Sequence, residues 1–166
     1  MLQMRQNMRI GFGYDIHPLK KGGKLILGGV KIDSERGLEG YSDADVVIHA
    51  VIDAILGASG QGDIGLHFPT NEIKWKDISS MVLLGNIYAL IKRKKYRINN
   101  IDITIVLEKP KILNYYPDMK KNIAKILKIN EDYINIKATT NEGIGILGKE
   151  DGIAAFCVAL LEEIVN

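Results

Sequence analysis

The sequence predicts an α+β fold, a sandwich in which helices pack on one face of a β-sheet. Residues 101–107 alternate apolar side chains with Asp102 and Thr104, as a half-buried strand does. Residues 46–56 are apolar on nearly every side, which is typical of a buried helix. The length of 166 residues fits one domain with a substantial core. We therefore expect a single domain over residues 1–166, with residues 1–7 as a polar leader.

The order of the elements can be read from periodicity and turn residues. Gly11 and Gly13 in the opening strand would let another backbone approach closely, and the pair Gly28 and Gly29 suits a hairpin turn. The hydroxyl and carboxylates of residues 42–45 suit a helix N-terminus. We expect strands at 8–17, 24–27 and 30–32, helices at 43–58 and 78–94, a strand at 101–107, a helix at 116–127 and a strand at 134–138, with a loop or short extended piece at 63–69.

The last segment, residues 152–165, is compatible with two structures. Propensity favours a helix, because Ala154, Ala155 and Ala159 are good helix formers. An unbroken apolar run also describes a buried central strand. If the segment is a strand, one face of the sheet still needs a cover, and that cover would have to come from other subunits.

Composition excludes several classes of protein. The chain has 22 basic and 20 acidic residues, so nothing in its charge indicates a nucleic-acid partner, and the basic run 92–97 reads as the solvated end of a helix. The single cysteine, Cys157, excludes an internal disulfide and fits a reducing compartment. No apolar run is long enough for a membrane helix, and residues 1–8 lack the apolar centre of a signal peptide. We expect a cytoplasmic protein with no membrane or nucleic-acid partner.

One histidine and two carboxylates share a face of the predicted buried helix. Asp45, His49 and Asp53 are spaced by four residues, one helical turn each. A buried imidazole costs free energy unless its nitrogens have partners, so His49 is either a satisfied core histidine or a metal ligand. Asp53 is a candidate partner that would fix the tautomer of the His49 ring.

A second pair of residues favours a metal site over a satisfied core histidine. Asp15 and His17 are two residues apart at the end of the opening strand, so their side chains point to one face. Together with His49 they would form a set of one carboxylate and two imidazoles, which leaves a tetrahedral Zn²⁺ one open position. This ligand set does not exclude Mn²⁺ or Fe²⁺.

Four motifs, taken together and in order, resemble the 2-C-methyl-D-erythritol 2,4-cyclodiphosphate synthase family. They are Gly13-Tyr-Asp-Ile-His17, Tyr41-Ser-Asp-Ala-Asp45 followed by His49, Gly62-Asp-Ile-Gly-Leu-His-Phe-Pro69, and Ala138-Thr-Thr-Asn-Glu142 with the segment 148–154. The resemblance implies a homotrimer of ferredoxin-like subunits with active sites between neighbours, and a final strand instead of a helix. The reaction it implies is an internal phosphoryl transfer that closes a cyclic diphosphate and expels cytidine monophosphate.

The resemblance also implies two metal sites and three catalytic residues. Zn²⁺ (or Mn²⁺) would be held by Asp15, His17 and His49, and Mg²⁺ or Mn²⁺ by Glu142 with the substrate diphosphate. The residues to which it gives catalytic roles are Thr140, Glu142 and Asp53.

Substrate contacts are implied along much of the chain. A cytidine-diphosphate-linked substrate would be bound by Asp15, His17, Tyr41, Ser42, Asp63, Ile64, Gly65, Pro110, Lys111, Ala138, Thr139, Thr140, Ile146 and Lys149. By their residue types alone, Asp63 would be a turn residue, Lys111 a surface lysine, and Thr139 and Thr140 a strand end.

Three departures distinguish this chain from the family pattern. Tyr41 stands where the family usually has a histidine that contacts phosphate, and Thr70 stands where it usually has aspartate. Ile146 and Lys149 replace an aromatic residue and an arginine, which in the family line a trimer cavity that can hold an isoprenoid diphosphate. Lysine keeps the charge there but loses the bidentate fork.

Two other functions compete with the cyclase. One is a metal-dependent phosphohydrolase on a similar scaffold. The other is a non-catalytic trimer that binds isoprenoid diphosphates.

Overall fold

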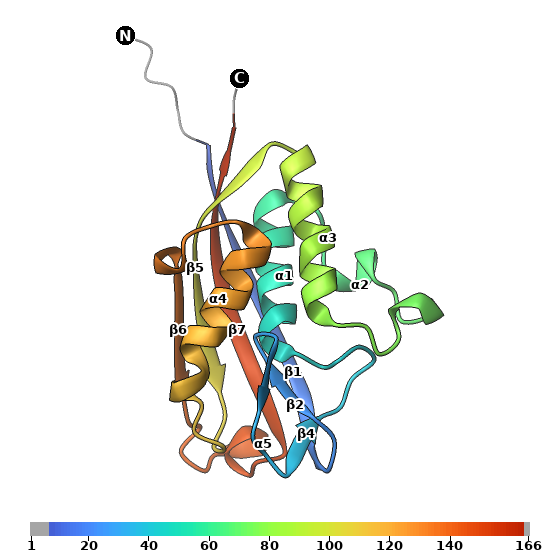
Figure 1. The fold of residues 1–166 in the computed structure, drawn as a ribbon, viewed down its shortest axis with the longest axis vertical. Helices are drawn as coiled ribbons and strands as arrows, with labels where there is room; N and C mark the ends of the chain where they lie inside the picture. The colour runs from blue at the N-terminus through green and yellow to red at the C-terminus, as the bar shows by residue number, and fades with distance from the viewer. Residues whose placement is uncertain (1–6, 165–166) are drawn as a thin grey trace.

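The computed structural model describes residues 7–164, which form a mixed five-stranded sheet covered by helices on one face (Figure 1). The β5–β6 pair is parallel, and the other pairs of this sheet are antiparallel. In spatial order the strands are β4 (Arg36–Leu38), β1 (Met8–Lys21), β7 (Gly152–Glu163), β5 (Tyr96–Val106) and β6 (Ile134–Thr139), and β2 (Leu25–Leu27) pairs with β3 (Val30–Ile32) as a separate hairpin. The predicted α+β class is confirmed.

Three long helices lie on the covered face of the sheet (Figure 1). Helix α1 (Val46–Ser59) packs on β1 and β7, α4 (Tyr116–Leu127) packs on β6, and α3 (Ser80–Arg93) lies against both helices. The short elements are α2 (Ile64–His67), α5 (Gly145–Gly148) and the 3-10 turns η1 (Ile73–Trp75), η2 (Leu113–Tyr115) and η3 (Glu131–Tyr133). Within residues 7–164, none of the helices combines the length and apolar character that crossing a membrane requires.

Helix α1 sits unusually close to β1 because the strand has glycines where the two meet. A Cβ atom at Gly11 would lie 1.9 Å from the carbonyl oxygen of Ala54, and one at Gly13 would lie 1.9 Å from that of Ala50. The close approach predicted for these glycines is confirmed. Since side chains alternate along a strand, Asp15 and His17 point to the same face as the glycines, toward α1.

The start of α1 is fixed by one buried carboxylate. Asp45 is the N-cap, and its Oδ1 accepts from the N–H of Ile48 at 3.2 Å. The same carboxylate accepts from the N–H groups of Gly28 at 2.9 Å and Gly29 at 2.6 Å, at the turn between β2 and β3. Burial raises the pKa of Asp45 to about 6, although these hydrogen bonds oppose the shift. The hairpin and the helix are therefore tied through a single side chain.

The final segment is a strand, as the family resemblance implied and against the helical propensity of its alanines. β7 lies between β1 and β5, and its alternate residues Ala155, Cys157 and Ala159 are buried under the helices. Small side chains at these positions leave room for α1 on the sheet. Burial between two neighbouring strands outweighed the intrinsic preference of alanine.

The remaining differences from the predicted elements are local. Strand β5 begins at Tyr96, earlier than expected, and β4 was not predicted, because a strand of three residues has too little alternation to recognise. The segment 63–69 contains α2 where a loop was expected. The expected leader, residues 1–7, lies outside the described residues except for Asn7, as does Val165.

The opposite face of the sheet carries exposed apolar side chains. Ile10 and Phe12 of β1 are 72% and 62% exposed, and Tyr14 and Ile16 continue the same row. Phe156 of β7 stacks near this row, 5.0 Å from Tyr14 between ring centroids. Such a contiguous apolar patch is typical of an interaction surface.

Candidate functional site

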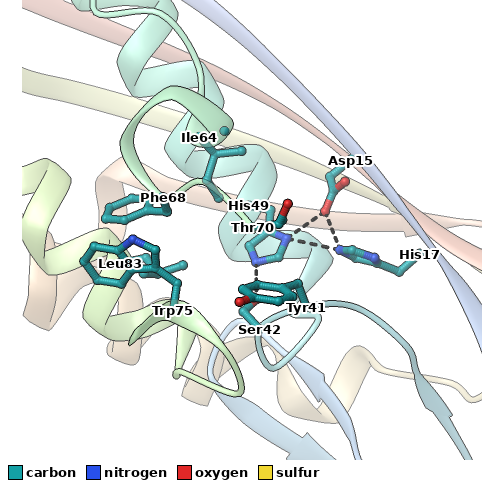
Figure 2. A pocket seen from close by; sticks show the side chains of 11 residues that line it. Asp15, His17, Tyr41, Ser42, His49, Ile64, Phe68, Thr70, Trp75 and Leu83 are labelled. Carbon is teal, nitrogen blue, oxygen red and sulfur yellow. Dashed lines mark hydrogen bonds and ion pairs between the residues drawn. The ribbon is translucent and has the colours of Figure 1, made fainter. Parts of the chain in front are cut away.

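The second half of β1 and the first turn of α1 bring three candidate ligands together. Asp15 and His17 come from alternate positions of β1, and His49 comes from α1, one turn after the Asp45 cap. Figure 2 shows the carboxylate and both imidazoles on the side of the pocket away from Phe68 and Trp75. The close packing described above thus places the helix residue over the two strand residues.

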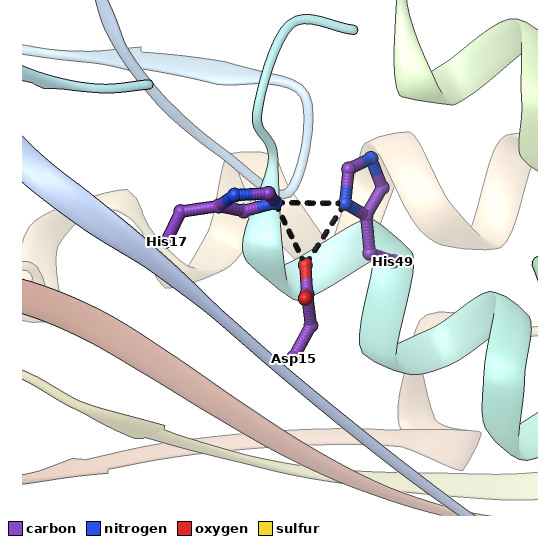
Figure 3. Close-up of side chains that lie close together, drawn as sticks. All are labelled: Asp15, His17 and His49. Atoms are coloured by element: carbon purple, nitrogen blue, oxygen red, sulfur yellow. Dashed lines mark hydrogen bonds and ion pairs between the residues drawn. The ribbon is translucent and has the colours of Figure 1, made fainter. Parts of the chain in front are cut away.

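The three ligand atoms form a triangle (Figure 3). Oδ2 of Asp15 lies 2.9 Å from Nε2 of His17 and 2.9 Å from Nδ1 of His49, and the two nitrogens are 3.1 Å apart. A tetrahedral Zn²⁺ site with bonds of roughly 2.0–2.1 Å has ligand–ligand edges of roughly 3.3 Å, so these atoms fit a metal ion after a small expansion. The predicted convergence of the three residues is confirmed.

The charges in the triangle favour a cation at its centre. Burial raises the pKa of Asp15, but its hydrogen bonds with His17 and His49 outweigh burial and hold that pKa well below its usual range. Burial lowers the pKa of His49, but its hydrogen bond and charge interaction with Asp15 outweigh burial and raise it above 6.5. The carboxylate is therefore ionised, and its negative charge stabilises a positive charge on or beside the His49 ring.

The second nitrogen of His49 contacts two hydroxyls. Its Nε2 lies 3.0 Å from Oγ of Ser42 and 2.9 Å from Oγ of Ser80. Asp53 does not take the place predicted for it beside the imidazole, because its Oδ1 accepts from the backbone N–H of Ile64 at 2.8 Å. The carboxylate that was expected to fix the His49 ring instead ties α1 to the start of α2.

Several of the residues predicted to bind the substrate lie around one cavity beside the triangle. The cavity has a volume of about 210 Å³ (Figure 2). It is lined by Asp15, His17, Tyr41, Ser42, His49, Ile64, Gly65, Phe68, Thr70, Trp75 and Leu83. Tyr41 donates its hydroxyl to the carbonyl oxygen of Glu72 at 3.2 Å. Asp63 does not line this cavity, since it caps α2 and accepts from the N–H of Leu66 at 2.9 Å.

The wall opposite the triangle is aromatic, which the sequence analysis missed. Phe68 and Trp75 meet edge to face with ring centroids 4.9 Å apart. Trp75 lies in a 3-10 turn whose sequence gives no periodic signal, so only the contact in space reveals it. Ser80 was missed for a similar reason, because serines at the start of a helix usually serve as caps.

A second cavity of about 380 Å³ gathers other residues that were predicted to bind the substrate. It is lined by Leu107, Glu108, Pro110, Lys111, Ile112, Leu113, Tyr116, Ala138, Thr139 and Thr140. Thr140 donates its hydroxyl to Oε1 of Glu142 at 2.8 Å. None of the three triangle residues lines this cavity.

Glu142 lies in an exposed loop with an uncommon backbone conformation, at φ = 51°. Glu108 holds this loop, accepting from the N–H of Asn141 at 2.8 Å and of Gly143 at 3.5 Å. Among the described residues, Asp15, His17 and His49 are the one group of three ligating side chains close enough to share a metal, so Glu142 stands apart from them. Ile146 and Lys149 are exposed and line neither cavity.

A mixed sheet with helices on one face and an Asp–His–His triangle beside a cavity defines an α+β protein with a candidate metal site. Comparison with known proteins gives the narrower assignment. The model of the YgbB family matches residues 8–162, and the chain belongs to this family.

Two relatives carry the same name. The chain is 56% identical over 154 residues to the 2-C-methyl-D-erythritol 2,4-cyclodiphosphate synthase of Clostridium kluyveri, covering 93% of this chain and 94% of that one. It is 52% identical over 155 residues to the synthase of the same name from Chlorobium luteolum, covering 93% and 99%.

Solved structures agree with the fold. The IspF of Plasmodium falciparum, in a CDP complex, superimposes with a TM-score of 0.84 at 38% identity, covering 96% of this chain and 99% of that one. The bifunctional IspDF of Campylobacter jejuni gives a TM-score of 0.92 at 37% identity, and here the match covers 96% of this chain and 43% of that longer one.

Proposed function

We propose that this chain converts 4-diphosphocytidyl-2-C-methyl-D-erythritol 2-phosphate to 2-C-methyl-D-erythritol 2,4-cyclodiphosphate and CMP. This is a phosphorus–oxygen lyase reaction of non-mevalonate isoprenoid biosynthesis. The observation that carries the proposal is the Asp15–His17–His49 triangle at the end of a cavity, in a chain 56% identical to a synthase of that name.

The reaction breaks one phosphorus–oxygen bond and forms another. An oxygen of the 2-phosphate attacks the β-phosphorus, and CMP leaves with the bridging oxygen. The protein must align the two oxygens and neutralise charge, because this transfer offers little covalent work. We propose Zn²⁺ or Mn²⁺ at the triangle and Mg²⁺ or Mn²⁺ at Glu142. Bound there, such ions supply Lewis-acid stabilisation of the phosphate oxygens.

The residues of the first cavity suit orientation and water exclusion. Ser42 and Thr70 offer hydroxyls to substrate oxygens, and Gly65 offers a backbone without a side chain in front of it. An apolar wall keeps water from competing with the attacking phosphate, and it consists of Ile64, Phe68, Trp75 and Leu83.

The residues of the second cavity suit the nucleotide. Lys111 and Thr140 can neutralise and hydrogen-bond phosphate oxygens, and the backbone at Pro110 and Ala138 can read the base. A CDP ligand in the related Plasmodium falciparum protein supports this part of the proposal.

We further propose a homotrimer of ferredoxin-like subunits, with the first cavity of one subunit meeting the second cavity of its neighbour. The exposed row Ile10, Phe12, Tyr14 and Ile16 supports it, because an apolar sheet face of this size needs a cover. Ile146 and Lys149 would face a central cavity that can hold an isoprenoid diphosphate. A cytoplasmic location is proposed from Cys157, which is a free, buried thiol.

Phosphorus NMR of the products tests the reaction. We expect cyclic diphosphate and CMP in equal amounts. Linear phosphate products would identify a phosphohydrolase instead, and binding of isoprenoid diphosphates without any turnover would identify a non-catalytic binding protein.

A further inference from the structure

Ser80 lies between a carboxylate and a candidate metal ligand. It is fully buried at the first residue of α3, and its Oγ is 2.9 Å from Nε2 of His49. The same Oγ donates to Oδ1 of Asp43, whose Oδ2 accepts the backbone N–H of Ser80 at 2.8 Å. The helix does not need this hydroxyl, because the cap of α3 is Ser79, which accepts from the N–H of Met81.

The direction of these hydrogen bonds follows from the number of protons. A serine hydroxyl carries one proton, and an ionised carboxylate can only accept. The Ser80 proton therefore points to Asp43, and the lone pairs of Oγ face His49. Nε2 of His49 must then be the donor, so Nδ1, which lies 2.9 Å from Oδ2 of Asp15 and 3.1 Å from Nε2 of His17, is the nitrogen that gives up its proton when a metal binds.

We propose that Asp43 and Ser80 are positioning residues that set the tautomer of His49. The carboxylate, acting through the hydroxyl, keeps the proton on Nε2 and so presents the Nδ1 lone pair to the metal. A metal-bound imidazole ordinarily donates its other N–H to a carboxylate or carbonyl. Here the Ser80 hydroxyl links the Asp43 carboxylate to the His49 ring, and Asp53 bonds the N–H of Ile64 instead.

The same arrangement determines what Ser42 can do. Its Oγ lies 3.0 Å from the same Nε2 and lines the cavity beside the triangle. Because Nε2 carries its single proton and has no free lone pair, Ser42 can only share that N–H with Ser80 as an acceptor, and it keeps its own hydroxyl proton for a partner in the cavity. If the proposed function holds, that partner is a phosphate oxygen of the substrate.

The test is the Zn²⁺ affinity of metal-stripped protein, measured by competition with a chromophoric chelator and without substrate. We expect Ser80→Ala and Asp43→Asn each to weaken Zn²⁺ binding by about 10- to 100-fold. The double variant should have the same Zn²⁺ affinity as the single variant with the lower affinity, because both changes break one chain of hydrogen bonds. Ser79→Ala is the matched control, since it removes a neighbouring serine that does not touch His49, and its affinity should stay unchanged.

Nitrogen NMR of the histidine side chains gives an independent readout. In the Zn²⁺-loaded wild-type protein we expect the proton on Nε2, exchanging slowly with solvent, and faster exchange in Ser80→Ala. A proton on Nδ1, additive losses in the double variant, or an unchanged Zn²⁺ affinity would overturn the proposal. If Ser80→Ala does not fold, Asp43→Asn and the wild-type spectrum still decide it. Failure to form cyclic product would overturn the proposed function and leave these measurements standing.

Discussion

His49 shows how a single residue can be recognised from sequence while its surroundings cannot. The spacing of Asp15 and His17 in a strand and the position of His49 in an apolar helix were enough to predict that they meet. The partner on the far side of the ring was predicted as Asp53, one turn away, but Ser80 occupies that place from another helix. Periodicity describes one element at a time, so contacts contributed by a different element escape it.

Replacing His49 by alanine should remove the metal and nearly all turnover while the chain stays folded. The reason is the loss of one of three ligands, and elemental analysis of the purified variant measures it. His67→Ala is the control, because Nε2 of His67 bonds the carbonyl oxygen of Gln61 at 2.8 Å, outside the triangle. Metal retained in His49→Ala would refute the ligand assignment.

Metal affinity should depend on pH through His49. A ligand imidazole must be unprotonated, and the raised pKa of His49 keeps its proton bound to higher pH than in a free histidine. Apparent Zn²⁺ affinity should therefore fall at least about tenfold for each pH unit below that pKa and level off above it. The lowered pKa of Asp15 means that its carboxylate does not add to this slope near neutral pH. Chelator competition at a series of pH values measures the slope, and a flat profile would contradict it.

Among the elements, β1 and α1 depend on each other through backbone contact. The sequence predicted the contact from two glycines, and it assigned the long helices and most strands correctly. The residue pattern did not decide whether β7 is a strand or a helix, because alanines suit an isolated helix and also suit a crowded central strand. Only the tertiary surroundings distinguish these cases.

Gly13→Ala should separate β1 from α1. The new Cβ would lie 1.9 Å from the carbonyl oxygen of Ala50, so the helix must shift, at a cost of about 1–3 kcal/mol or more in the free energy of unfolding. Because Ala50 follows His49, Zn²⁺ affinity should fall as well. Gly85→Ala in α3 is the control, since nothing lies within 4 Å of its Cβ position and alanine should stabilise the helix by up to about 1 kcal/mol. Denaturant unfolding of both variants measures the difference.

Glu108 should matter through the loop that it holds. Glu108→Ala removes the acceptor for the N–H groups of Asn141 and Gly143, so Glu142 should lose its position. We expect the Mg²⁺ concentration for half-maximal activity to rise about tenfold, with Zn²⁺ affinity unchanged. Glu108→Gln keeps an acceptor oxygen and should restore most of the activity. Equal losses in both variants would instead indicate that the charge of Glu108 acts directly.

One face of the sheet is uncovered in the whole molecule. The sequence analysis expected this only for the case in which the last segment is a strand. The predicted fold class and the covered face are confirmed, but a single sequence does not reveal which surfaces of two copies fit together. The triangle and Glu142 are separate within one chain, and this separation, like the uncovered face, supports the proposed assembly of several subunits.

Phe12→Glu should prevent assembly without disturbing the metal triangle. The side chain is 62% exposed on the outer face, whereas the ligands of β1 point inward, so Zn²⁺ affinity should be kept. Light scattering after size exclusion should show a trimer for the wild type and a monomer for the variant. Val82→Glu, on an exposed apolar residue of α3, should remain trimeric. A wild-type monomer would refute the trimer.

Strand β1 has two roles because its side chains alternate between the two faces of the sheet. Its odd-numbered positions supply Gly11, Gly13, Asp15 and His17 to the helix side, and its even-numbered positions supply the apolar outer row. Deleting or inserting one residue would exchange these two sets, turning carboxylate and imidazole outward and forcing bulky rings against α1. A change in the length of this strand would therefore disturb both of its faces at once, whereas a substitution in the outer row changes only one of them.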